Sequence, residues 1–189
     1  MSGRSIRRVT VLAILLLASA ALPSHAQPAG ERLIVPIPPT FKLAGQIPHD
    51  GATIEVFVPA NETMENWSEQ IATQVRFNMA ARTDLVALLH VVEQIWMDDC
   101  KESPPITILP VKTNGYATAT MLMQCPRLAS TGKPEGSLFH AIKGTDNLYL
   151  VQKNTRTVLD RDKIKEMVRY MGTVTVCDSR TPEHPCLAK

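Results

Sequence analysis

Residues 106–124 read ITILPVKTNGYATATMLMQ, two runs rich in apolar residues on either side of Asn114-Gly115. Asn-Gly between two such runs favours a β-hairpin, because both residues readily adopt the positive φ angles of a tight turn. A second hairpin is predicted from residues 138–143 and 148–153, which flank the turn formers of residues 144–147. Antiparallel hairpins are therefore expected to decide the fold.

Two amphipathic helices are predicted beside these hairpins. The longer spans residues 83–99 with Thr83 as its cap, and its apolar face comprises Leu85, Leu88, Leu89, Val92, Ile95 and Trp96. The shorter begins at its cap Asp160 and ends at Gly172, and its expected inward residues are Ile164, Met167, Val168 and Met171. Hairpins with one central and one C-terminal helix predict an α+β fold, an antiparallel sheet packed with helices.

Residues 71–79 fit two patterns. Apolar residues alternate with Ala72, Gln74 and Arg76, as in a strand, but Ile71 and Val75 also fall on a helical i, i+4 stripe. The β-branched residues on the alternating face favour a strand. Further strands are predicted at residues 53–58 and 174–177.

The first 26 residues have the features of a cleaved export signal. Three arginines precede the apolar run of residues 9–22, and Ser24-His25-Ala26 matches the small-x-small pattern of a cleavage site. The run is shorter than the roughly 20 residues that a membrane-spanning helix needs. We therefore expect residues 27–189 to form a single periplasmic or secreted domain with a short polar leader and no membrane span.

Removal of the signal would change the charge of the chain. The remaining residues carry 17 Lys and Arg (20 minus 3) against 18 Asp and Glu, a net charge of −1. No basic block remains, which argues against nucleic acid as a partner.

The four cysteines are Cys100, Cys125, Cys177 and Cys186. An even number in an exported chain indicates two disulfides, for which three pairings are possible. Cys100 and Cys125 flank the first hairpin and Cys177 and Cys186 bracket a short loop, so we favour these two pairs. The loop between Cys177 and Cys186 would then be closed at the C-terminus.

The sequence contains none of the G-x-S-x-G, P-loop, G-x-G-x-x-G or H-E-x-x-H motifs. We assign no catalytic residue, cofactor or metal site. The leading hypothesis is a non-catalytic binding or accessory module for an unknown protein or small-molecule ligand in the cell envelope. Its expected surface is a groove between the sheet and the long helix, lined by Trp67, Trp96, Tyr116 and Tyr149.

Two alternatives remain open. An envelope hydrolase could use a dispersed site at His140 with Asp146 or Asp178. A soft-metal protein could use Cys177, His184 and Cys186, with Met121 and Met123 as auxiliary ligands. The acidic group of Asp98, Asp99 and Glu102 is interpreted as a solvated helix end rather than a cation site.

Several segments resemble those of a group of small exported proteobacterial proteins of uncharacterised function. The segments are residues 65–67, 73–75, 125–126, 139–144, 146–152, 176–178 and 184–186, which are distributed over most of the chain after the signal. The order of elements also resembles the PsbP/Mog1-like α+β sandwich. Both resemblances imply a fold, and neither implies catalytic residues.

Overall fold

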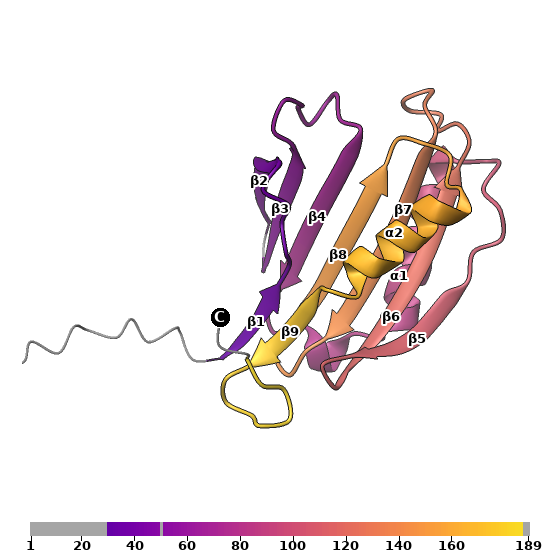
Figure 1. The fold of residues 1–189 in the computed structure, drawn as a ribbon. Coiled ribbons are helices and arrows are strands. Elements are labelled where there is room, and N and C mark those ends of the chain that lie inside the picture. The colour runs from indigo at the N-terminus through magenta and orange to yellow at the C-terminus, as the bar shows by residue number, and fades with distance from the viewer. Residues whose placement is uncertain (1–29, 50, 187–189) are drawn as a thin grey trace, which may run out of the picture.

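The computed structural model describes residues 30–49 and 51–186 (Figure 1). The expected signal peptide, residues 1–26, lies outside these ranges. The main sheet has seven antiparallel strands in the order β2-β3-β4-β8-β7-β6-β5. Their bounds are β2 Phe41–His49, β3 Ala52–Pro59, β4 Glu69–Arg76, β5 Ile108–Thr113, β6 Tyr116–Cys125, β7 Glu135–Lys143 and β8 Leu148–Thr155. With two α-helices beside this sheet, the α+β prediction is confirmed.

Both predicted hairpins are present. Thr113 pairs with Tyr116 across the first turn, where Asn114 and Gly115 have φ angles of 48° and 83°. The Asn114 side chain donates a hydrogen bond to the carbonyl of Val176 (2.9 Å), so this turn is held to the C-terminal part of the chain.

The turn of the second hairpin, between β7 and β8, is held by Glu31. Its carboxylate accepts hydrogen bonds from the backbone amides of Thr145, Asp146 and Asn147. A Cβ atom at Gly144 would lie 2.1 Å from a Glu31 carboxylate oxygen, so a side chain at this position would displace the Glu31 carboxylate from the turn.

Residues 71–76 of the ambiguous segment lie in strand β4, as favoured, whereas residues 77–79 follow the strand as a turn. Strand β4 lies in the middle of the sheet between β3 and β8. Strand β2 at the sheet edge was not predicted from the sequence. It contains Gly45 and Pro48 and a register shift between Leu43 and Gly45, so it lacks a regular alternation. An edge position tolerates both residues.

The two helices cover opposite faces of the sheet (Figure 1). Helix α1 (Leu85–Asp99) packs on β6 and β7, and helix α2 (Arg161–Met171) packs on the other face of β7 and β8. Asp160 caps α2 as predicted, but α1 is capped by Asp84, whose carboxylate accepts from the amide of Ala87, and not by Thr83. A short 3-10 helix, η1 (Ala80–Arg82), precedes α1. Within the described ranges, none of the helices has the length and hydropathy needed to span a bilayer.

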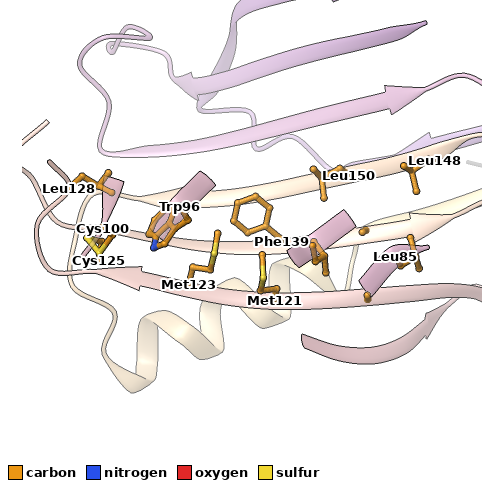
Figure 2. Packing of buried hydrophobic residues seen from close by; sticks show 13 residues of the cluster. Leu85, Trp96, Cys100, Met121, Met123, Cys125, Leu128, Phe139, Leu148 and Leu150 are labelled. Carbon is orange, nitrogen blue, oxygen red and sulfur yellow. A yellow bond between two sulfur atoms is a disulfide. The ribbon is translucent and has the colours of Figure 1, made fainter. Parts of the chain in front are cut away.

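The core under α1 is shown in Figure 2. Trp96, Met121, Met123 and Phe139 fill the space between helix and sheet, and the disulfide of Cys100 with Cys125 lies at one end. Ile95 was expected to join this core and does not, since 67% of its surface is exposed. Ile95 instead lines a groove beside the helix, together with residues of β4 and β8.

Two short strands outside the main sheet bring the ends of the described chain together. Strand β1 (Glu31–Ile34) pairs antiparallel with β9 (Thr175–Asp178), which follows α2. Cys177 in β9 forms a disulfide with Cys186. The two disulfides are therefore the pairs that the sequence analysis favoured.

Candidate functional site

A large groove lies beside α2, and we call it the α2 groove. Helix α2 covers β7 and β8 but leaves the same face of β5 and β6 uncovered. The resulting groove of about 620 Å³ is lined by Pro105, Thr107, Leu109, Val111, Thr120, Leu122, Leu138, His140, Ile164, Val168, Met171 and Gly172. Eight of these twelve are apolar residues other than glycine, so the groove offers mainly hydrocarbon surface.

The strand pattern explains one wall of the groove. Pro105, Thr107, Leu109 and Val111 alternate along the chain, so their side chains point to one face. The opposite wall includes Val168, which was expected to face the core but is 54% exposed. Val168 lies on the flank of α2 towards β5 and β6, where no element covers the sheet.

His140 is the one ionisable side chain that lines this groove. Its side chain is 8% exposed, and its Nε2 lies 2.9 Å from the Thr113 hydroxyl. Nδ1 is buried without a hydrogen-bond partner among the described residues. Burial lowers the pKa of His140, because desolvation disfavours the charged imidazolium. The groove therefore has a neutral imidazole in its floor at pH 7.

A smaller cavity of about 260 Å³ continues from the α2 groove towards the first hairpin turn. It shares His140, Val111, Met171 and Gly172 with the groove. Its other lining residues include Lys112, Thr113, Asn114 and Thr175, so this end of the combined space is more polar and has a cationic residue.

Asp146 and Asp178, the carboxylates considered for a hydrolytic site, are both bound by Arg180. Arg180 donates to the Asp178 carboxylate through Nε and Nη2, and Nη2 also donates to Asp146 (2.6 Å). The hydrogen bonds from Arg180 hold the pKa of Asp178 below its usual value. His140 instead pairs with Thr113, so the structure does not favour a His140–carboxylate dyad.

The residues considered for a soft metal also have other roles. Cys177 and Cys186 are joined in a disulfide, which removes both thiolates. His184 stacks on Tyr116 with 3.8 Å between ring centroids, and its Nδ1 lies 2.7 Å from the Asn114 carbonyl. Met121 and Met123 are buried under α1 on the other face of the sheet. No group of three His, Cys, Asp or Glu able to hold a metal ion occurs in the described part of the chain.

The four aromatic residues proposed as a binding surface lie apart. Trp67 packs with Val56 and Val58, and Arg156 lies over its ring, 4.3 Å from the ring centroid. Tyr116 and Tyr149 belong to the core under α2. Only Trp96 of the four borders the groove beside the long helix. Tyr116 and Tyr149 point from β6 and β8 to the opposite face of the sheet, under α2, and Trp67 lies in the loop before β4. Alternation along each strand separates the two faces, but which face α1 covers depends on the packing of the whole fold.

The expected groove beside the long helix does exist, and we call it the α1 groove. It encloses about 590 Å³ between α1 and the strands β4 and β8. Its apolar lining comes from α1 and from Met123, Phe139 and Leu150 of the sheet. Gln74, Arg76 and Gln152 of the strands add polar groups. Glu135 lies at the end near the C-terminus of α1 and lines the same space.

The pH dependence of stability tests the environment of Glu135. Burial raises its pKa to about 7 from the usual 4.5, although the nearby Arg156 opposes the shift. Between pH 4.5 and 7 the folded protein thus binds a proton at Glu135 that the unfolded chain does not. Protonation of Glu135 therefore stabilises the folded state at low pH, and this stabilisation is lost as the pH rises through 7. We expect Glu135→Gln to increase the free energy of unfolding by roughly 2 kcal/mol at pH 8 and by little at pH 5.

Urea unfolding of the wild type and the variant at both pH values measures this difference. His140 titrates in the opposite direction, since its lowered pKa makes acid destabilising, but it contributes equally to both proteins. If Glu135→Gln changes the free energy of unfolding equally at pH 5 and pH 8, the raised pKa of Glu135 is contradicted.

No protein-family model and no curated protein matches this sequence. Among solved structures, the chain is similar to the Ran-binding protein Mog1p of Saccharomyces cerevisiae, with 15% identity, 76% of this chain and 85% of that chain covered, and a TM-score of 0.42. It is also similar to LpqN, which is involved in cell envelope biogenesis of Mycobacterium tuberculosis, with 9% identity, coverage of 80% and 87%, and a TM-score of 0.38. These similarities are low and concern architecture alone.

Proposed function

We propose that this chain is an exported, non-catalytic binding module that takes a small apolar ligand in the α2 groove. The observation that carries the proposal is the lining of this groove, in which apolar side chains from β5, β6, β7 and α2 surround one neutral imidazole. Its volume of about 620 Å³ falls within the 300–1,000 Å³ typical of small-molecule sites.

The chemistry of the lining argues against a charged ligand. An ion that enters the groove would lose water, and the groove has no charged side chain among its described lining residues to replace that water. A ligand with a hydrocarbon body instead gains roughly 25 cal/mol for each Å² of apolar surface that it buries. Thr107, Thr120 and His140 provide the few polar contacts that can orient it.

The two disulfides support export. Cytosolic thiols are normally kept reduced, whereas disulfides of this structural type persist in the periplasm or outside the cell. This agrees with the signal peptide expected at residues 1–26. Purified protein that begins at Gln27 would establish the cleavage.

Fluorescence titration with 1-N-phenylnaphthylamine, a neutral apolar probe, tests the binding site. Val168→Glu places a carboxylate on the exposed wall of the α2 groove and is expected to weaken probe binding at least tenfold, or by about 1.4 kcal/mol. Ile95→Glu is the matched control, because it places the same charge on an exposed apolar position of α1, 67% exposed against 54% for Val168.

The control should bind the probe as the wild type does, and circular dichroism should show that both variants are folded. Absence of probe binding by the wild type, or equal loss in both variants, would reject the α2 groove as the site.

A further inference from the structure

The α2 groove and the smaller cavity that continues from it form one space, and its lining changes from apolar to polar along its length. The two parts share Val111, His140, Met171 and Gly172. Of the eight residues that line the groove alone, six are apolar, whereas Val174 is the single apolar residue among the five that line the smaller cavity alone. A ligand that fills both parts therefore meets hydrocarbon at one end and polar groups at the other.

Strand β5 sets the direction of this change. Leu109, Val111 and Thr113 alternate along the strand and face α2, with Leu109 in the groove and Thr113 in the smaller cavity. At roughly 3.3 Å per residue, Leu109 and Thr113 are about 13 Å apart. His140 lies where the two parts join, and its Nε2 is 2.9 Å from the Thr113 hydroxyl. The apolar and polar parts of a ligand would thus be separated along β5.

The polar end has a backbone donor and acceptor that the sheet does not use. Thr113 and Tyr116 flank the two-residue turn and exchange backbone hydrogen bonds, as do Val111 and Thr118. The amide and the carbonyl of Lys112 therefore point away from β6. Strand β5 is at the edge of the main sheet, so among the described strands none pairs with this side. Alternation turns the Lys112 side chain to the α1 face, and its backbone borders the smaller cavity.

The charges around the polar end offset one another. Lys112 is the one charged residue among the described residues that line the smaller cavity, and its charge is positive. Met171 and Gly172 line the same cavity at the C-terminal end of α2, which carries the negative end of the helix dipole. Asp178, the acidic residue of β9, is bound by Arg180. An anionic head group would face the helix end and a cationic head group would face Lys112, so neither charge is favoured.

We propose that the ligand of this site is an uncharged amphiphile, a hydrocarbon chain or ring system that ends in a hydroxyl group. Its hydrocarbon lies in the α2 groove, and its hydroxyl lies in the smaller cavity beside the backbone of Lys112. A hydroxyl group both donates and accepts hydrogen bonds, which matches the free amide and carbonyl of Lys112. This inference rests on the proposed binding of an apolar ligand in the α2 groove and specifies the class of that ligand.

Displacement of bound 1-N-phenylnaphthylamine by three ligands with the same alkyl chain tests the head group. 1-Dodecanol is expected to displace the probe at concentrations about tenfold lower, or more, than dodecanoate and dodecyltrimethylammonium, because the smaller cavity does not replace the water that a charged head group loses. Absence of displacement by 1-dodecanol, or equal or stronger displacement by either charged ligand, would overturn the uncharged amphiphile. A wild-type protein that does not bind the probe would instead reject the proposed function itself.

Two substitutions at Lys112 test the orientation of the ligand. Lys112→Pro removes the amide N–H at an edge position equivalent to that of Pro110, and should weaken 1-dodecanol binding about fivefold, as expected for one neutral hydrogen bond. Lys112→Gln is the matched control, because it removes the charge and keeps the amide, and it should bind 1-dodecanol as the wild type does.

Both Lys112 variants should keep the wild-type affinity for 1-N-phenylnaphthylamine, which reports that the α2 groove is intact. If Lys112→Pro binds 1-dodecanol as tightly as the wild type, the hydroxyl does not lie beside this amide and the orientation is wrong. An equal loss in Lys112→Pro and Lys112→Gln would also overturn it, because the side chain and not the backbone would then contact the ligand.

Discussion

Glu69→Gln is expected to lower the free energy of unfolding by about 3 kcal/mol at neutral pH. Glu69 lies in β4 and accepts a hydrogen bond from Lys153 of β8 (2.5 Å) and another from Lys163 of α2 (2.6 Å). The Lys153 side chain is only 5% exposed, with its ammonium 5.1 Å from the centre of the Phe41 ring. Loss of the Glu69 carboxylate leaves the Lys153 ammonium buried beside the Phe41 ring without a counter-charge.

The pKa of Glu69 supports this role. Burial opposes its ionisation, but the hydrogen bonds from Lys153 and Lys163 outweigh burial and hold the pKa below its usual value. The contribution of Glu69 is therefore complete above pH 4.5 and is lost as the pH falls through the folded-state pKa.

Urea unfolding at pH 7 measures the loss. Glu166→Gln is the matched control, because Glu166 also accepts from Lys163 but is half exposed, and its replacement should cost less than about 0.5 kcal/mol. The double variant Glu69→Gln/Lys153→Met should recover much of the loss, since it removes the buried charge itself. If Glu69→Gln and Glu166→Gln lower the free energy of unfolding by similar amounts, the buried Lys153 ammonium does not need Glu69 as its counter-charge.

Removal of the disulfide between Cys100 and Cys125 is expected to have a comparable effect. The two cysteines are 25 residues apart, and the chain-entropy relation gives about 3.5 kcal/mol for a loop of that length. Both residues are fully buried beside Trp96 and Leu128 (Figure 2), so their replacement by alanine also loses packing. A fall in melting temperature of roughly 10 °C should follow for a domain of this size.

The second disulfide provides the comparison. Cys177 and Cys186 are nine residues apart, for which the same relation gives about 2.6 kcal/mol. Urea unfolding should therefore show a larger loss in the free energy of unfolding for Cys100→Ala/Cys125→Ala than for Cys177→Ala/Cys186→Ala. A larger loss from the second pair would mean that the contacts of its loop, such as His184 on Tyr116, dominate.

Local chemistry explains which elements could be predicted. Asn114-Gly115 and the capping residue Asp160 act on their immediate neighbours, and the structure has a turn and a helix start there. Strand β2 has no such signal: it contains Gly45 and Pro48 and lies at the edge, where partial exposure removes the alternation of polar and apolar residues. Its existence follows from pairing with β3, which a local pattern does not encode.

The grooves could be predicted only in part. A groove beside the long helix was expected, and it is present with Trp96 at its border. The α2 groove was not expected, because it depends on which strands a helix leaves uncovered. Sequence periodicity places Leu109 and Val168 on apolar faces. It does not show that the two faces line the same groove. Strand order decides that, and hairpin signals alone do not determine strand order.

The pairing of β1 with β9 has a consequence for the time course of folding. Synthesis proceeds from the N-terminus, so Glu31–Ile34 is made before the strands of the main sheet, whereas Thr175–Asp178 is made after them. The main sheet can assemble meanwhile, because its strands are contained in residues 41–155. We expect the β1–β9 ribbon to form after the main sheet, and Glu31 can reach the turn between β7 and β8 at the earliest after residue 147 has been made. A chain truncated before β9 would keep its central sheet but leave its first strand without a partner.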